Sequence, residues 1–446
     1  MPELSPESLL PALASAPRLW VAYSGGLDSH VLLHACAVLR GRLDGELRAV
    51  HLDHGLHADS LGWAGHCHGV CEALAVPLTV RRLRIDAGPG DSLEAVARAA
   101  RYAVLAALLG PDEAVATAQH RDDQAETLLL ALLRGSGVHG LAAMPARSAL
   151  GAGRLLRPLL GFGRADLRAY ALRHGLEWVD DPSNADTGLD RNFLRHRVLP
   201  ALGERWPSAA RTLARSAAHC AEAAELIDAA ADERLAALGG ARPETLSVGA
   251  VRRLEPALAR SVLRRWLVKR GFRAPDRVRL HQIFADVMQA RADADPLVGW
   301  DGCEVRRYRD DLFALAPLPA PPPAQVIAWD GAGPLELPNA LGRLVPAQGP
   351  ECPLSELKVL IGSRGMPPLR CRRPGGAPSR SLKDLFQQAG VPPWLRVHVP
   401  LLQRGGDLAA VAGVARCGES PLAVIWEGHP WTGLGVFIEG LPPAAR

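Results

Sequence analysis

The chain has 446 residues, of which 48% are hydrophobic and 22% are charged. This balance is typical of a folded globular protein and excludes a disordered chain. At roughly 100–200 residues per domain, the length predicts two or three domains. The formal net charge of +4 permits RNA binding but does not establish it.

Membrane insertion and secretion find no support in the sequence. The first residues lack the basic and apolar regions of a secretory signal, and apolar runs such as 128–133 are too short to cross a bilayer. The eight cysteines are scattered and contain no CxxC pair, which predicts a reduced, cytoplasmic compartment. The oligomeric state is left open, and a homodimer is one assembly that the sequence allows.

The first 200 residues alternate predicted strands and helices. Ser5-Pro6 is typical of a helix start and predicts a short N-terminal helix. Strands are predicted at 19–23, 49–52, 78–83 and 114–118, and helices at 29–39, 59–75, 92–109 and 122–133. This alternation predicts parallel strands joined by right-handed crossovers. We therefore expect residues 1–203 to form a doubly wound α/β domain that binds its ligand beyond the carboxyl ends of the strands.

The remaining chain divides by composition. Residues 204–316 are rich in Ala, Leu and Arg and are predicted to form a mainly helical domain. A proline-rich linker follows at 317–323. Short runs separated by Gly and Pro predict a small mixed α/β domain at 325–446. The arginines between 252 and 279 form either a solvated helix face or a surface for a nucleic-acid backbone.

A glycine-containing loop connects the first predicted strand to its helix. The loop reads Ser24-Gly25-Gly26-Leu27-Asp28-Ser29. Glycines let the backbone turn tightly, so that its N–H groups and the helix N-terminus can bind an anion. Asp28 would repel phosphate unless a cation lay between them, which predicts Mg²⁺ at this aspartate. The alternative is a tight strand-to-helix turn without a ligand.

The loop differs from the common phosphate-binding motifs. It matches neither GxxxxGK[ST] nor GxGxxG, and no lysine precedes Lys269. A lysine-free loop for ATP fits a reaction that releases pyrophosphate and transfers AMP to a substrate. The missing lysine also argues against a ligase that forms a lysine adenylate on the enzyme.

The string SGGxDS at 24–29 resembles the signature of the PP-loop ATP pyrophosphatases, and further motifs resemble the tRNA(Ile)-lysidine synthase family within that superfamily. The resemblance covers both ends of the chain, whereas residues 205–350 contain few motifs that resemble the family. The further motifs are His51-Leu52-Asp53-His54-Gly55-Leu56, Ala97-Arg98-Ala99-Ala100-Arg101-Tyr102, the run from Thr117 to Thr127, Arg134-Gly135-Ser136-Gly137, Gly140-Leu141, Arg157-Pro158-Leu159-Leu160, Asp181-Pro182-Ser183-Asn184, Arg191-Asn192-Phe193-Leu194-Arg195, Arg372-Arg373-Pro374-Gly375-Gly376, Leu382-Lys383-Asp384-Leu385-Phe386, Val391-Pro392-Pro393-Trp394-Leu395-Arg396 and Val399-Pro400-Leu401-Leu402.

The resemblance implies that the domains at 204–316 and 325–446 bind tRNA. It also implies a two-step reaction on an isoleucine tRNA with a CAU anticodon. ATP adenylates the C2 oxygen of the wobble cytidine, and pyrophosphate leaves. The side-chain amine of free L-lysine then attacks C2 and expels AMP. The product, lysidine, pairs with A in place of G, so that AUA is read as isoleucine.

The resemblance also implies roles for individual residues. Asp123 and Glu126 lie one helical turn apart and are expected to bind the lysine or its transition state, with Asp123 as a candidate proton acceptor. The expected catalytic residues are Asp28, Asp123, Glu126, Arg191 and Arg101. The expected ATP-binding residues are Ser24, Gly25, Gly26, Leu27, Asp28, Ser29 and His51. The expected contacts to tRNA or lysine are His120, Arg98, Arg195, Arg372 and Arg373.

Two positions depart from the family pattern, and other interpretations stay open. Gln119 stands where the family usually has a histidine, and His57 stands where an arginine is common. A related tRNA thiolase is the main alternative, although such enzymes often need paired cysteines. A nonenzymatic RNA-binding protein is a third, and the intact loop argues against it. The segment His66-Cys67-His68 with Cys71 also admits a metal site, with partly buried helix residues as the alternative.

Overall fold

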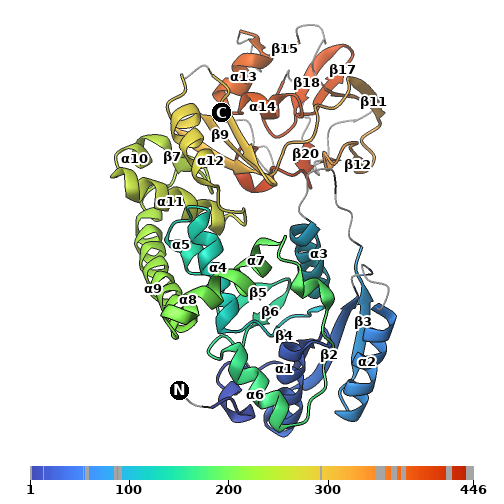
Figure 1. Ribbon diagram of the computed structural model, residues 1–446. Coiled ribbons are helices and arrows are strands. Elements are labelled where there is room, and N and C mark those ends of the chain that lie inside the picture. The colour runs from blue at the N-terminus through green and yellow to red at the C-terminus, as the bar shows by residue number, and fades with distance from the viewer. Residues whose placement is uncertain are drawn as a thin grey trace. The chain divides into compact units, whose positions relative to one another are not determined.

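The computed structural model of the protein forms two compact units, Met1–Leu226 and Ile227–Arg446 (Figure 1). No helix among the described residues is long and apolar enough to span a membrane. The domain boundaries expected at 203/204 and between 316 and 325 stay predictions. The structure describes residues 3–13, 15–53, 55, 60–84, 88, 93–291, 294–346, 357–362, 369–372, 378–417 and 424–437.

A six-stranded sheet organises the first unit. Its order is β3-β2-β1-β4-β6-β5, and every neighbouring pair is parallel except β5 with β6. The strands are β1 (Arg18–Ala22), β2 (Glu46–Asp53), β3 (Leu78–Arg82), β4 (Ala114–Ala116), β5 (Arg147–Leu150) and β6 (Gly153–Leu156). The helices are η1 (Pro6–Leu9), α1 (Leu27–Val38), η2 (Arg40–Arg42), α2 (Ser60–Ala73), α3 (Leu93–Leu108), α4 (Arg121–Leu133), α5 (Val138–Leu141), α6 (Arg164–Arg173), η3 (Pro182–Ala185), α7 (Asp190–Phe193), η4 (Leu194–Val198), α8 (Leu199–Arg205) and α9 (Ala209–Leu235), which continues into the second unit.

Apolar side chains cover both faces of this sheet because successive residues of a strand point to opposite sides. In β1, Leu19 and Val21 belong to a core that includes residues of α1, α2 and α6. Trp20 belongs to the core on the opposite face, with Leu105 of α3. The doubly wound α/β prediction is therefore confirmed, and the predicted strands and helices differ from the observed ones by only a few residues at their ends.

The direction in which successive strands are added to the sheet reverses between β1 and β4. From β1 the chain runs to β2 and β3 on one side, and β4 then pairs with β1 on the other side. Loops at the carboxyl ends of two such adjacent strands diverge and leave a crevice for ligands. The loop 24–29 follows β1 and the segment 117–120 follows β4, so the topology brings the two motifs to the same place.

The second unit contains helices and four further sheets. Residues 246–315, within the predicted helical segment, also contain an antiparallel sheet of order β7-β10-β9-β8. Its helical elements are α10 (Val248–Arg252), α11 (Pro256–Lys269), α12 (Arg277–Gln282), η5 (Ile283–Met288), α13 (Leu382–Gln388), α14 (Pro393–Arg396) and η7 (Thr432–Leu434). Its strands are β7 (Leu246–Ser247), β8 (Leu297–Trp300), β9 (Cys303–Tyr308), β10 (Asp311–Leu315), β11 (Gln325–Trp329), β12 (Leu335–Glu336), β13 (Arg343–Pro346), β14 (Leu357–Ile361), β15 (Arg370–Cys371), β16 (Arg380–Ser381), β17 (Leu401–Arg404), β18 (Asp407–Val411), β19 (Ala415–Arg416) and β20 (Val424–Glu427).

The residues on either side of the proline-rich segment share a core. Phe313 of β10 meets Trp394 of α14 edge-on, with ring centroids 5.7 Å apart. Leu318, within the predicted linker, packs against the same core. Trp394 is only 7% exposed and belongs to this core. Residues 317–323 therefore follow the surface of one compact unit instead of acting as a free spacer.

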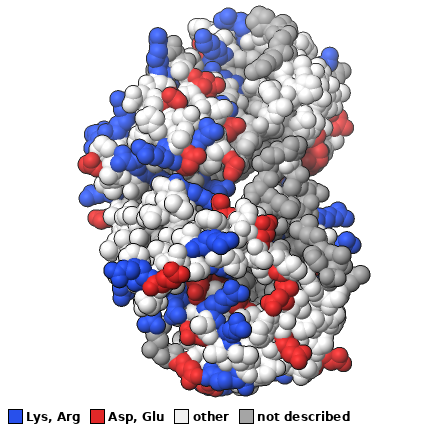
Figure 2. Space-filling view, in the orientation of Figure 1, with Lys and Arg blue, Asp and Glu red and all other residues white. Residues whose placement is uncertain are grey.

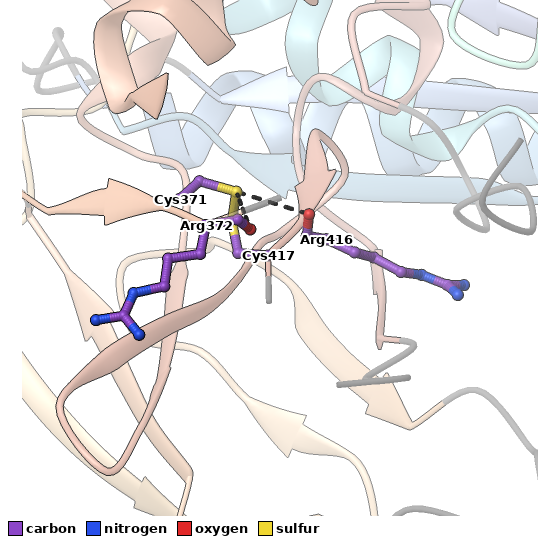
Figure 3. The surroundings of a disulfide bond; sticks show 4 residues. All are labelled: Cys371, Arg372, Arg416 and Cys417. Atoms are coloured by element: carbon purple, nitrogen blue, oxygen red, sulfur yellow. Dashed lines mark hydrogen bonds between the residues drawn. A yellow bond between two sulfur atoms is a disulfide. The ribbon is translucent and has the colours of Figure 1, made fainter. Parts of the chain in front are cut away.

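One cysteine pair departs from the predicted reduced state. Cys371, at the end of β15, forms a disulfide with Cys417, which directly follows β19 (Figure 3). The two residues are 46 positions apart, so no local spacing in the sequence marks them as partners. Packing of β15 against β18, the neighbour of β19 in another sheet, brings their Cα atoms to 5.0 Å, within the range that a disulfide needs. Figure 3 shows the side chains of Arg372 and Arg416, the neighbours in sequence, extending away from the bridge.

Candidate active site

The loop between β1 and α1 is built to leave backbone N–H groups available. Gly26 is the N-cap of α1 and supplies no side-chain cap. Ser29 Oγ donates to the Gly26 carbonyl at 3.0 Å and accepts from the Ser24 amide at 3.2 Å. These bonds close the loop on itself, while the first N–H groups of α1 lack partners within the helix. The arrangement suits an anion at this helix N-terminus.

Gly25 has two reasons to be glycine. Its φ of +88° lies in the left-handed region, which residues with a Cβ rarely adopt. A Cβ at this position would also lie 3.2 Å from the Sγ of Cys67 in α2. The loop therefore runs closely over α2 because it has no side chain there.

Two buried histidines, His30 and His51, contact backbone segments that adjoin the loop. His30 Nδ1 contacts the Glu177 carbonyl at 2.7 Å, and the Val179 amide donates to the Gly25 carbonyl at 3.0 Å. His51 is 5% exposed, and its Nδ1 lies 2.9 Å from the Tyr23 carbonyl. His51 thus contacts the backbone of the residue that precedes the loop, and its expected contact with ATP stays a prediction.

His120 connects the loop to the acidic motif on α4. It is only 1% exposed, and its Nε2 lies 3.5 Å from Asp28 Oδ2 and 3.5 Å from Asp123 Oδ2. Its Nδ1 lies 3.6 Å from Asp122 Oδ2. Three carboxylates thus surround one buried imidazole, and they come from two different strand ends.

This acidic surrounding decides the protonation of His120. Burial lowers the pKa of His120, but its contacts with Asp122 and Asp28 and the charge of Asp123 outweigh burial and raise the pKa to about 10. Burial raises the pKa of Asp122, but the contacts with His120 and with the Arg164 amide bring it down to about 2. At neutral pH the imidazole is therefore a cation between carboxylates and cannot accept a proton.

Glu126 lies between two arginines. Its side chain is fully buried, and its Oε2 and Oε1 accept from Arg191 Nε and Arg195 Nε, each at 2.7 Å. Arg195 Nη2 also donates to Asp123 Oδ1 at 3.0 Å. Burial lowers the pKa of the Arg195 guanidinium. Its hydrogen bond with Glu126 and the charge of that residue outweigh burial, so the pKa is raised. The residues Asp28, His120, Asp123, Glu126, Arg191 and Arg195 are called the polar cluster below.

The remaining predicted residues belong to α3 and to the second unit. Arg98 of α3 is exposed, and its guanidinium lies over the Tyr102 ring of the same helix at 5.2 Å. Arg101 follows on the same exposed surface of α3. Arg372 is largely exposed and lies 3.7 Å from Asp407. Arg373 and His57 lie outside the described residues.

The metal alternative at α2 gains no support. Cys67 and Cys71 are buried, and burial raises the pKa of Cys67 to about 12 and that of Cys71 to about 11. Across the described part of the chain, no group of three or more His, Cys, Asp or Glu side chains could hold a metal ion.

Two parts of the site, Asp122 and the segment Glu177–Val179, were not predicted from the sequence. Asp122 contacts His120 and accepts from the Arg164 amide at 2.9 Å, which ties α4 to α6. Its position beside Asp123 in the motif is the signal that could have included it. The segment Glu177–Val179, which holds the loop, carries no comparable signal because it acts through backbone groups.

Comparison with known proteins agrees with this geometry. The PP-loop domain family matches residues 5–202, which contain the loop and the polar cluster. The TilS substrate binding domain matches 246–313, and the TilS substrate C-terminal domain matches 361–421. A tRNA(Ile)-lysidine synthase of Alkalilimnicola ehrlichii is 46% identical over 429 residues, covering 93% of this chain and 94% of that protein. The chain belongs to the tRNA(Ile)-lysidine synthase family.

Other relatives bear the same name. The tRNA(Ile)-lysidine synthase of Methylococcus capsulatus is 45% identical, with 92% of this chain and 94% of that protein covered. The one from Coxiella burnetii is 40% identical, with 93% of each covered. The family resemblance predicted from the motifs is therefore confirmed, and so is the use of ATP that the PP-loop implies.

A solved structure of the U34-tRNA thiolase NcsA from Methanococcus maripaludis is similar over 49% of this chain and 77% of that chain, at 13% identity and a TM-score of 0.43. This likeness is too weak to support the thiolase alternative, whereas the lysidine synthases match across both units.

Proposed function

We propose that this protein makes lysidine in an isoleucine tRNA with a CAU anticodon. ATP adenylates the C2 oxygen of the wobble cytidine, and free L-lysine then displaces AMP from C2. The observation that carries the proposal is the contact of His120 with both Asp28 and Asp123, 3.5 Å each, which joins the ATP loop to the acidic motif. Membership of the lysidine synthase family supports the same reaction.

In the first step the loop binds the phosphates of ATP. The amides at the start of α1 and the hydroxyl groups of Ser24 and Ser29 are the donors. Mg²⁺ fits this place because Asp28 Oδ1 is buried without a hydrogen-bond partner among the described residues. Mg²⁺ is usually held by one or two carboxylates together with substrate phosphates, so an all-protein cage is not required. When bound, the ion would neutralise charge on the phosphates.

In the second step the lysine amine must lose a proton as it attacks. His120 is already protonated at neutral pH, so we assign the proton to Asp123. Glu126 acts as a positioning residue because both of its oxygens are engaged by arginines. Held in this way, Arg191 and Arg195 present fixed positive charge to the lysine carboxylate or to the AMP phosphate.

Further contacts to tRNA are proposed for arginines of both units. Arg98 and Arg101 on α3, and Arg372 and Arg373 in the second unit, would contact the phosphate backbone. A homodimer and a cytoplasmic location stay parts of the proposal, the latter because the tRNA substrate is used there.

The test is incorporation of labelled lysine into transcripts of isoleucine tRNA with a CAU anticodon. Methionine tRNA shares that anticodon and is the control. ATP-dependent labelling of the isoleucine transcript alone, with release of AMP and pyrophosphate, is the expected result. Labelling from a sulfur donor, or no dependence on ATP, would overturn the proposal.

A further inference from the structure

A hollow in the second unit lies far from the polar cluster in sequence. It has a volume of about 710 Å³ and is lined by residues of α10, α11, α12 and η5, all between 251 and 289. Its apolar lining includes Val251, Ala259 and Leu280, which are buried, and Phe284, which is partly exposed. The volume falls in the range of small-molecule sites.

The rim of the hollow is cationic. Arg252, Arg260 and Arg277 line it and are exposed, and the lining contains no Asp or Glu. Within the described parts of the chain, no ion pair engages any of these three guanidinium groups. Figure 2 shows Lys and Arg side chains gathered over the part of this face where Figure 1 places α10, α11 and α12.

The acidic residues nearest in sequence are already occupied. Glu255, the N-cap of α11, accepts from the Ala257 amide at 2.8 Å. Asp276, the N-cap of α12, accepts from the Arg279 amide at 2.7 Å. These carboxylates stabilise helix starts, so the rim arginines keep their charge available for a ligand.

An apolar slot with the Phe284 ring, the His281 imidazole and several separate cations fits a planar base with flanking phosphates. Bases inside an RNA duplex are stacked and cannot enter such a slot, whereas an unpaired base can turn out and stack on an aromatic side chain. We propose that this hollow is an RNA subsite that takes one unpaired nucleotide of the tRNA. The base lies against Phe284, and the neighbouring phosphates lie against Arg252, Arg260 and Arg277.

This inference rests on the proposed function, because it assumes that the substrate is a tRNA. The charge pattern favours RNA over an anionic amphiphile: three cations at separate points on the rim match the repeated phosphates of a nucleic acid strand, whereas an amphiphile carries one head group. All lining residues also fall within 246–313, the segment that matches the TilS substrate binding domain.

The test compares Phe284→Leu with the unchanged full-length protein. Leucine keeps an apolar side chain in the slot, so the unit stays packed, but it removes the ring face on which a base stacks. The probe is a dye-labelled single-stranded hexaribonucleotide, and a hairpin of the same strand length without unpaired ends is the comparison. We expect Phe284→Leu to weaken single-strand binding by about tenfold, the size of one lost stacking contact, and to leave hairpin binding unchanged.

Arg253→Gln is the matched control, because Arg253 follows Arg252 but does not line the hollow. It should change single-strand binding by less than about twofold, within the range of an ordinary surface substitution. Equal binding by Phe284→Leu and the unchanged protein would overturn the subsite. The subsite would also be overturned if a fluorescent fatty acid bound in the hollow and Phe284→Leu had no effect on RNA binding.

The lysine-incorporation assay separates this inference from the proposed function. If the unchanged protein forms lysidine, Phe284→Leu should raise the KM for tRNA by about tenfold and leave kcat unchanged, since the lost contact is the same in ground and transition states. If the unchanged protein forms no lysidine, the proposed function fails, and the oligonucleotide measurement still decides whether the hollow binds unpaired RNA.

Discussion

The polar cluster and the hollow use arginine in opposite ways. In the polar cluster, Arg191 and Arg195 are partly buried and each donates to the fully buried Glu126 at 2.7 Å. On the rim of the hollow, Arg252, Arg260 and Arg277 are exposed, and no ion pair to them is found in the described residues. The same residue type is thus fixed in one region and left available in the other.

The difference teaches what each region can do. Charges that are buried and mutually paired are held in one geometry before a substrate arrives, which is what transition-state stabilisation requires. Exposed arginines can instead adapt to a phosphate backbone, and they add affinity that depends on salt. Substitutions in the cluster should therefore affect folding and chemistry together, whereas substitutions on the rim should affect binding alone.

The largest expected effect comes from Glu126→Gln. Removing one carboxylate leaves two guanidinium groups facing an uncharged amide, so the free energy of unfolding should fall by about 3–5 kcal/mol. Urea unfolding measures the change. Glu46→Gln breaks the exposed pair with Arg18, 3.0 Å apart, and should cost at most about 1 kcal/mol. Equal losses in the two variants would show that the cluster does not depend on its buried charges.

The next effect is on catalysis. Asp28→Asn removes the carboxylate nearest the proposed phosphate site, and tRNA-dependent release of pyrophosphate should fall by at least about 100-fold. Asp122→Asn is the control, because Asp122 also contacts His120, at 3.6 Å, but lies on α4 and outside the loop. Comparable rates in the two variants would mean that Asp28 acts only through His120.

The pH dependence of stability tests the protonation of His120. Its pKa is raised from 6.5 to about 10 in the folded protein, so its contribution is fully present below the unfolded pKa of 6.5 and is lost as the pH rises toward 10. Between about pH 7 and about pH 8.5 the unchanged protein should lose about 2 kcal/mol more than His120→Asn. Urea unfolding at both pH values supplies the comparison. Parallel pH profiles would show that His120 has an ordinary pKa.

The smallest effect sharpens the description of the rim. Replacing Arg252, Arg260 and Arg277 together by glutamine should reduce the slope of log Kd against log salt by about 2, which is about 0.7 for each single-strand phosphate contact. Binding of the hexaribonucleotide at several salt concentrations gives the slope, and urea unfolding should show little change. An unaltered slope would place the phosphates elsewhere, and a large loss of stability would contradict the availability of these arginines.

The sequence alone determined the fold class and the ATP loop because both depend on local order. Alternating apolar runs predicted the strands and helices of the first unit, and the six consecutive residues 24–29 carry the loop whatever lies around them. Asp123 and Glu126 could be placed on one helix face by their spacing.

Only the tertiary structure decided which residues far apart in the sequence come into contact. The pairing of Glu126 with Arg191 and Arg195, the contact of His120 with Asp28, and the disulfide between Cys371 and Cys417 all link residues far apart in the chain. The protonation of His120 followed from burial among three carboxylates, which no local pattern reveals. The rim of the hollow likewise arises because three separate helices pack together, so the sequence shows only the arginines and not the slot between them.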